Sequence, residues 1–225
     1  MSSSPQAVRA DAVARPDGAV GAPITAVVFD LGGVLIDWDP RHLYRQLFDN
    51  ADEMERFLAD VTTAEWNRTL DAGRSWTEAV DELAAIYPEH RSLIEAYHVR
   101  WPEMLGDAIE GTVEVLKDVR ATGLPVYALS NWSARTYPVT RGRYPFLEWF
   151  DGVVISGDVG VAKPDPRIYR ALIERFGIAP EQSVFIDDVA ANVQAAGAMG
   201  FRTIRFEDPD RLRRSLVELA VLPAG

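Results

Sequence analysis

The sequence predicts an α/β fold, a doubly wound parallel sheet with a Rossmann-like core into which a helical domain is inserted. Short apolar runs with high β propensity alternate with longer helical patterns from Ile24 onward, as in folds built from β-α-β units. Each run is continuously apolar, which is typical of strands covered on both faces. Nearly 95 residues separate the first run from the second, whereas an ordinary crossover with its helix needs about 30.

The five apolar runs are the predicted strands, and they extend over residues 24–29, 124–129, 153–155, 184–186 and 203–206. Helices are predicted between them from apolar stripes, formed by Ile109, Val113, Leu116 and Val119 and by Ile168, Leu172 and Phe176. Three helices are expected to end at a left-handed glycine, namely Gly123, Gly177 and Gly200. Two are expected to begin at an Asp-Pro pair, Asp165-Pro166 and Asp208-Pro209.

The long gap after the first strand is predicted to hold a small helical domain over residues 36–105. Three apolar faces at helical spacing support it, made of Met54, Phe57, Leu58 and Val61, of Trp76, Val80, Leu83 and Tyr87, and of Leu93, Tyr97, Trp101 and Met104. Trp66, Trp76 and Trp101 are expected to build its core rather than a platform for a sugar. The core domain is then residues 23–35 and 106–225, and residues 1–22 are predicted to be a flexible tail.

The composition excludes several classes of function. Among 225 residues, 23 Lys and Arg stand against 34 Asp and Glu, a formal net charge of −11, which argues against a nucleic acid or an anionic membrane as partner. The absence of cysteine excludes disulfides, thiolate nucleophiles and Cys-ligated metal centres. No stretch approaches the roughly 18 apolar residues of a membrane span, and the N-terminal residues lack the apolar block of a signal peptide. A cytoplasmic protein is expected.

Polar residues follow the carboxyl ends of the predicted strands, where ligands bind in doubly wound sheets. Asp30 ends the first strand, Ser130 and Asn131 end the second, Lys163 follows the third, and Asp187 and Asp188 end the fourth. Three converging carboxylates would repel one another unless a cation such as Mg²⁺ neutralised them. A lysine and a hydroxyl beside such a cation suit phosphoryl transfer, for which a carboxylate can serve as nucleophile.

Four motifs at these positions resemble those of the haloacid dehalogenase (HAD) superfamily, in the subfamily IA-type group whose helical cap follows the first strand. They are FDLGGVL around Asp30, LSNW around Ser130, VAKPDPRIY around Lys163 and VFIDDVAAN around Asp187 and Asp188. The likeness extends over residues 24–219, and the first motif is similar to that of some sugar-phosphate phosphatases. The resemblance implies a HAD-like core and a helical cap that selects the substrate.

The resemblance also implies a role for each matching residue of the catalytic site. Asp30 is the implied nucleophile, and Lys163 would bridge the phosphate and this nucleophile. Ser130 and the backbone N–H of Asn131 would hold the transferring phosphoryl group. The implied catalytic residues are therefore Asp30, Ser130 and Lys163, and the implied phosphate-binding residues are Ser130, Asn131 and Lys163.

The same resemblance implies the ligands of a Mg²⁺ cofactor. Asp30 and Asp188 would bind the ion directly, and Gly32 would contribute its backbone carbonyl. Asp187 would be a second acidic contact, with Asn192 as outer support. A simpler interpretation of Asp187 and Asp188 is that they cap the helix that follows them.

Gly32 departs from the family pattern, because most family phosphatases carry at this position an Asp that protonates the leaving oxygen. General acid catalysis contributes about 10²–10⁴-fold, so we expect either that water, a residue of the helical domain or a substrate with a good leaving group replaces this acid, or that turnover is slow. His42 and Asp39, at the entry to the helical domain, are the candidates that the sequence offers. A positive φ at Gly32 is a further expectation.

The predicted function is that of a Mg²⁺-dependent phosphatase acting on a small phosphorylated metabolite, for example a sugar phosphate, through an aspartyl-phosphate. One alternative is a 2-haloacid dehalogenase, in which Asp30 would attack carbon without a metal; the acidic pair Asp187-Asp188 disfavours it. A phospho-receiver module is disfavoured by the order of the motifs and by the insertion. A catalytically weak protein that binds a phosphorylated ligand is the remaining alternative, because Gly32 supplies no acid.

Overall fold

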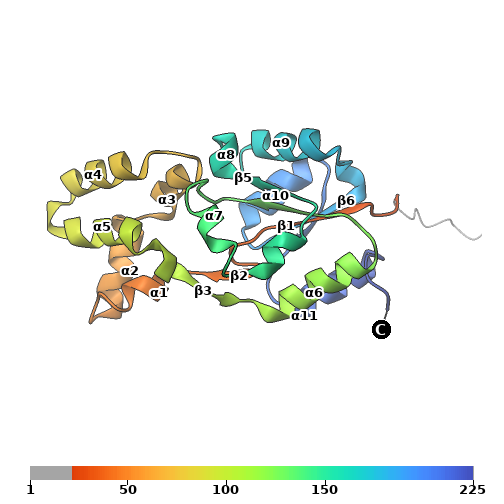
Figure 1. Cartoon of the computed structure of the whole chain (residues 1–225), viewed down its shortest axis with the longest axis horizontal. Coiled ribbons are helices and arrows are strands. Elements are labelled where there is room, and N and C mark those ends of the chain that lie inside the picture. The colour runs from red at the N-terminus through yellow and green to blue at the C-terminus, as the bar shows by residue number, and fades with distance from the viewer. Residues whose placement is uncertain (1–21, 225) are drawn as a thin grey trace, which may run out of the picture.

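A computed structural model describes residues 22–224 and shows a core sheet domain joined to a helical region (Figure 1). The predicted N-terminal tail lies outside the described residues except for Ala22. The core sheet has five parallel strands in the order β5-β4-β1-β6-β7. Their bounds are β1 Ala26–Phe29, β4 Val126–Ser130, β5 Gly152–Ile155, β6 Ser183–Asp187 and β7 Arg202–Arg205. The predicted α/β fold with a parallel sheet is confirmed.

The central strand β1 shows why the apolar runs are continuous. Val27 and Phe29 pack into one apolar cluster, whereas Val28 packs into a second cluster on the opposite face of the sheet. Because successive side chains of a strand point to opposite faces, both faces of β1 are covered and all three side chains are fully buried.

Four longer helices cover the two faces of the sheet: α6 Glu110–Ala121, α9 Pro166–Phe176, α10 Ala190–Ala198 and α11 Pro209–Glu218. In Figure 1, α6 and α11 lie together on one side of the sheet and α9 on the other. The expected caps are present, since Asp165 and Asp208 accept hydrogen bonds at the starts of α9 and α11. Gly123, Gly177 and Gly200 have φ values of +84°, +66° and +97°, as predicted for glycines that end helices. Shorter helical segments are α7 Tyr137–Thr140, α8 Ser156–Val159, η3 Pro145–Trp149 and η4 Pro180–Gln182.

The inserted region is helical, as predicted. Its elements are α1 Arg41–Tyr44, α2 Ala51–Asp60, α3 Ala64–Asp71, α4 Trp76–Ile86, η1 Pro88–His90, α5 Arg91–Val99 and η2 Trp101–Met104. Aromatic rings form its centre: Tyr97 lies 5.1 Å from Trp66 and 6.3 Å from both Tyr44 and Trp76, measured between ring centroids. Apolar area buried by such rings is large enough to stabilise a small helical domain.

Two short strands that the sequence analysis did not predict connect the inserted helices to the core. Strand β2 (Ile36–Trp38) pairs with β3 (Leu105–Ala108) in an antiparallel ribbon. Each strand carries an exposed Asp at its centre rather than a continuous apolar run, so only the pairing between them reveals the ribbon. None of the helices within residues 22–224 combines the length and the apolar character needed to cross a bilayer.

Candidate active site

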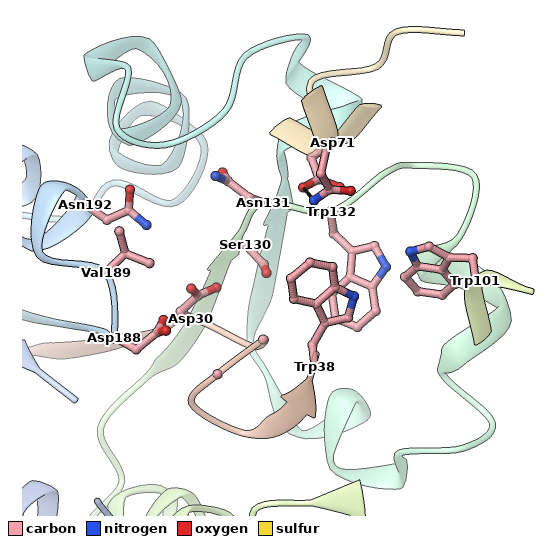
Figure 2. Close-up of a pocket in the computed structure, with 13 residues that line it drawn as sticks. Asp30, Trp38, Asp71, Trp101, Ser130, Asn131, Trp132, Asp188, Val189 and Asn192 are labelled. Carbon is pink, nitrogen blue, oxygen red and sulfur yellow. Dashed lines mark hydrogen bonds between the residues drawn. The ribbon is translucent and has the colours of Figure 1, made fainter. Parts of the chain in front are cut away.

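The carboxyl ends of β1, β4 and β6 border a pocket with a cavity volume of about 280 Å³. Figure 2 shows Asp30, Ser130 and Asp188 on one side of this pocket and three tryptophans on the other. Of the predicted site residues, Asp30, Gly32, Ser130, Asn131, Asp188 and Asn192 line it. Lys163 and Asp187 do not line it and are fully buried.

Asp30 directly follows β1 and is 7% exposed, with its carboxylate held from two directions. Its Oδ1 accepts a hydrogen bond from the backbone N–H of Leu31 at 2.7 Å, and its Oδ2 lies 2.9 Å from Nζ of Lys163. Burial raises the pKa of Asp30; Lys163 opposes this shift, while Asp187 and Asp188 add to it. A fixed carboxylate at the pocket wall, with its charge only partly compensated, can act as a nucleophile.

Lys163 uses all three N–H bonds of its ammonium group on buried partners. Its Nζ donates to the carbonyl of Leu129 at 2.8 Å and to Asp187 at 2.7 Å, and lies 2.9 Å from Asp30. Burial lowers the pKa of Lys163, but the two carboxylates outweigh it and the net shift is upward. The structure therefore assigns Lys163 first to holding Asp30 and Asp187; contact with a phosphate would require it to exchange one of these partners.

Asp187 and Asp188 are adjacent in sequence but face different surroundings. Asp187 accepts hydrogen bonds from Lys163, from Nδ2 of Asn192 at 3.0 Å and from the backbone N–H of Val189 at 2.9 Å. Val189 is the residue before α10, and no side chain between residues 22 and 224 caps that helix, so the capping interpretation of Asp187 and Asp188 is not supported. Asp188 is partly exposed and lines the pocket. Thus Asp187 contacts Lys163 below the surface, whereas Asp188 is the member of the pair that lines the pocket.

Asp30, Asp187 and Asp188 fit a divalent cation. One carboxylate oxygen from each lies within 4.8 Å of the others. Burial and the nearby Asp187 raise the pKa of Asp188, which is the state expected of a carboxylate cluster without its neutralising charge. Because Asp187 already has three protein partners, Asp30 and Asp188 are the better candidates for direct ligands, and oxygen ligands of this kind suit Mg²⁺.

Ser130 and Asn131 connect the second strand to the pocket. Ser130 ends β4, lines the pocket, and its hydroxyl forms no hydrogen bond with any other residue between 22 and 224. The side chain of Asn131 accepts from the backbone N–H of Lys163 at 2.7 Å and donates to the carbonyl of the same residue at 3.0 Å. This pair of hydrogen bonds holds the Lys163 segment against the end of β4.

The turn after Asp30 needs a glycine at position 33 rather than at position 32. Gly33 has φ of +75°, and a Cβ there would lie 2.7 Å from Oδ2 of Asp188. Gly32 does not have a positive φ, and a Cβ there would meet only Cβ of Trp38 at 3.7 Å. The expectation of a positive φ at Gly32 was therefore wrong by one residue, because the left-handed turn comes where the chain passes closest to Asp188.

Replacing Gly33 by Ala is expected to lower the free energy of unfolding by at least about 1–2 kcal/mol, the cost of a left-handed conformation for an L-residue. Displacement of Asp188 would add to this loss. The matched variant Gly32→Ala should leave stability within about 1 kcal/mol of the parent. Urea denaturation of both variants tests this expectation, and equal stability of the two would contradict the proposed need for glycine at position 33.

Seven further residues line the pocket and were not among the predicted site residues: Gly33, Trp38, Asn67, Asp71, Trp101, Trp132 and Val189. Trp101, assigned by the sequence analysis to the core of the helical domain, is 5% exposed and also faces the pocket. Trp132 was detectable, since it follows Ser130 and Asn131 in the same motif. Asp71 carried no sequence signal, because it ends a cap helix 41 residues after Asp30.

The two residues expected to replace the missing acid do not line the pocket. Nε2 of His42 pairs with Oδ2 of Asp37 at 2.9 Å, and Asp39 accepts from Arg41 at 3.1 Å. Asp39 follows β2 directly and His42 lies in α1, so both come after Trp38, the residue of this segment that lines the pocket. The expectation for His42 and Asp39 was therefore wrong.

Comparison with known proteins adds independent information. The model of the haloacid dehalogenase-like hydrolase family matches residues 24–200. A solved structure of a HAD-family enzyme from Bacteroides thetaiotaomicron, in complex with magnesium and inorganic phosphate, is similar with a TM-score of 0.61 and 26% identity, covering 84% of this chain and 98% of that one.

Curated relatives include both phosphatases and dehalogenases. Phosphatase MT3486 of Mycobacterium tuberculosis is 27% identical over 212 residues, 86% of this chain and 92% of that protein. (S)-2-haloacid dehalogenase 1 of Pseudomonas sp. is 29% identical over 198 residues, 81% of this chain and 84% of that protein. Two other relatives are much longer, since this chain spans 37% of drimenol cyclase drtB of Aspergillus calidoustus and 20% of acyl-CoA dehydrogenase family member 10 of Mus musculus.

Proposed function

Because this chain belongs to the haloacid dehalogenase-like hydrolases, we propose that it is a Mg²⁺-dependent phosphatase that acts on a small phosphorylated metabolite through an aspartyl-phosphate. The observation that carries the proposal is the cluster of Asp30, Asp187 and Asp188, with oxygens within 4.8 Å of one another beside a pocket. The cavity of about 280 Å³ suits a small ligand. The magnesium and phosphate bound by the similar Bacteroides enzyme support the same choice.

Each residue of the pocket has a place in the proposed reaction. A carboxylate oxygen of Asp30 attacks phosphorus while the bond from phosphorus to the ester oxygen breaks. Ser130 and the backbone N–H of Asn131 hold the phosphoryl oxygens, and Lys163 keeps Asp30 in position. Asp30 and Asp188 would hold Mg²⁺, which would supply charge neutralisation for the phosphate. Attack of water on phosphorus then breaks its bond to Asp30 and releases inorganic phosphate.

The dehalogenase alternative uses the same nucleophile on a carbon atom, and it is represented among the relatives. Charge distinguishes the two reactions here. A metal-free dehalogenase would have to keep three carboxylates, those of Asp30, Asp187 and Asp188, close together. Among residues 22–224, Lys163 is the one cation that forms an ion pair with Asp30 or Asp187. Assays of phosphate release from a panel of phosphate esters, including sugar phosphates, and of halide release from a 2-chloroacid separate the two functions.

Phosphate release is expected to require Mg²⁺, to stop in excess chelator and to return when Mg²⁺ is added back. Burial raises the pKa of Asp30, so in the metal-free protein its contribution to stability is present below about pH 4 and is lost as the pH rises through the raised pKa. Mg²⁺ binds the ionised carboxylates, and its stabilising effect should therefore be larger at about pH 8 than at about pH 5. Thermal unfolding with and without Mg²⁺ at the two pH values measures this difference.

Asp188→Asn is the control for this experiment, because it removes one of the two proposed direct ligands. It should abolish most of the Mg²⁺-dependent rise in melting temperature. Full phosphatase activity after extensive dialysis against chelator would contradict the metal assignment. Halide release without phosphate release would instead favour the dehalogenase.

A further inference from the structure

The missing acid at Gly32 leaves open where the departing alcohol obtains its proton, and the cap offers one carboxyl group to the pocket. Asp71 is the last residue of α3 and lines the pocket together with Asn67 from the same helix. Figure 2 shows Asp71 across the pocket from Asp30 and Asp188, on the side where Trp38 and Trp132 lie. A leaving group attached to a phosphate held at Asp30 and Ser130 would extend into the space between these two sides.

Two hydrogen bonds hold Asp71 in this place. Nδ2 of Asn67, one helical turn earlier, donates to Oδ2 of Asp71 at 2.9 Å. The hydroxyl of Ser156, in the core domain, donates to the backbone carbonyl of Asp71 at 2.6 Å and accepts from the backbone N–H of Trp132 at 2.8 Å. Asp71 is thus attached to the core beside the phosphate-binding segment, although it belongs to the cap.

The surroundings of Asp71 favour its protonated form. Burial is the main cause that raises the pKa of Asp71 to about 8; Asp30 adds to the shift, while Asn67, Arg68 and Lys163 oppose it. Tyr97, from helix α5, is a further titratable side chain close enough for the charge of Asp71 to raise its pKa. No Lys, Arg or His forms an ion pair with Asp71 among the residues from 22 to 224.

The position of Asp71 in its helix argues against a purely structural role. It lies at the C-terminal end of α3, where the helix dipole disfavours a negative charge. A carboxylate that only stabilised the fold would be better placed at the start of a helix. In addition, Oδ1 of Asn67 is buried with no hydrogen-bond partner within the described part of the chain, and such a group at a pocket wall is suited to contact a ligand.

We propose that Asp71 is the general acid of this site, supplied by the cap in place of a second aspartate at position 32. The proposal rests on the phosphatase function proposed above. As the ester bond breaks, Asp71 gives its proton to the oxygen of the departing alcohol and becomes a carboxylate. In the second step this carboxylate takes a proton from the water that attacks phosphorus, so that the site returns to its starting state with the release of inorganic phosphate.

The effect of a general acid on the rate depends on how much protonation the leaving oxygen needs. The variant Asp71→Asn tests the proposal for this reason. Asn keeps the shape of Asp and removes the proton. For alkyl phosphates we expect kcat/KM to fall by about 10²–10⁴-fold. For 4-nitrophenyl phosphate, whose leaving oxygen needs little protonation, the fall should be less than about tenfold. The measured quantity is the ratio of the two rates in the variant and in the parent protein.

Asp60→Asn is the matched control, since Asp60 also ends a cap helix, α2, but is exposed and does not line the active-site pocket. It should leave both rates unchanged. A rescue variant completes the test: Gly32→Asp, which the backbone at position 32 accommodates, should restore alkyl ester hydrolysis in the Asp71→Asn background by at least about tenfold. A loss of structural support at Asp71 would not be repaired by a carboxyl group at position 32.

The pH profile of the parent protein provides a second measurement that does not depend on the folding of any variant. The kcat/KM of alkyl phosphates should fall as Asp71 loses its proton above about pH 8, whereas that of 4-nitrophenyl phosphate should not show this fall. Two results would overturn the assignment of Asp71 while leaving the proposed function intact. One is an equal loss of kcat/KM for both esters in Asp71→Asn, and the other is the same fall of kcat/KM at alkaline pH for both esters in the parent protein. Absence of Mg²⁺-dependent phosphatase activity, or full activity of Asp30→Asn, would overturn the proposed function as well.

Discussion

Replacement of Asp30 by Asn is expected to lower phosphatase turnover by on the order of 10⁴-fold or more, because an amide cannot form the acyl-phosphate bond. The fold around this residue should survive, since the single side-chain oxygen of Asn can still accept from the backbone N–H of Leu31, although its amide nitrogen cannot accept from Lys163 as Oδ2 of Asp30 does. Steady-state rates with an aryl phosphate measure the effect without dependence on the general acid.

Two controls accompany this variant. Far-ultraviolet circular dichroism and cooperative thermal unfolding should show that Asp30→Asn keeps the parent fold. Binding of inorganic phosphate in the presence of Mg²⁺ should remain measurable, because Ser130 and Asn131 are intact. A variant that retained a rate within tenfold of the parent would show that water, rather than Asp30, attacks phosphorus directly.

Loss of Lys163 is expected to give the largest change in stability. Lys163→Met preserves much of the side-chain volume but leaves the buried carboxylates of Asp30 and Asp187 without their shared cation. Removing one partner from a buried ion pair costs about 3–5 kcal/mol. Urea denaturation of metal-free protein at neutral pH should show a loss of this size, together with loss of activity.

The chain contains one other lysine, Lys117, and it provides the matched control. Lys117 pairs with Glu114 at 3.3 Å on the surface, where both side chains are 61% exposed, and such pairs contribute about 0–1 kcal/mol. Lys117→Met should therefore be nearly neutral. The loss in Lys163→Met should grow as the pH rises from about 5 to 8, because the unpaired carboxylates can take up protons only at the lower pH. A loss independent of pH would indicate that the missing packing, rather than the missing charge, destabilises the variant.

The strands and the motifs at their ends were predictable because both depend on local sequence. A strand covered on both faces is apolar along its length, as β1 is and as Val184–Ile186 of β6 are, and such runs can be recognised without knowing their neighbours. In a parallel sheet the carboxyl ends of all strands lie at one edge, so the convergence of Asp30, Ser130 and Asp188 followed from the strand assignment alone.

The different contacts of Asp187 and Asp188 were not predictable from the motif. Sequence places Asp187 and Asp188 as equivalent neighbours, but successive side chains at the end of a strand point in opposite directions. Asp187 consequently points to Lys163 and Asn192, and Asp188 to the pocket. The same limit explains the error at Gly32, since the close approach to Asp188 that requires glycine at position 33 is a contact between distant segments.

The sequence by itself determined the α/β class, the helical insertion and the residues at the strand ends, because strand periodicity and helix caps are set by residues within one or two turns of each other. Only the tertiary structure decided which cap residues meet the core. Asp71 reaches the pocket because Ser156 holds the end of α3 against the core, whereas His42 pairs with Asp37 and does not line the pocket. The position of one domain over another depends on contacts between residues far apart in the chain, such as the 85 positions between Asp71 and Ser156, and no local pattern encodes them.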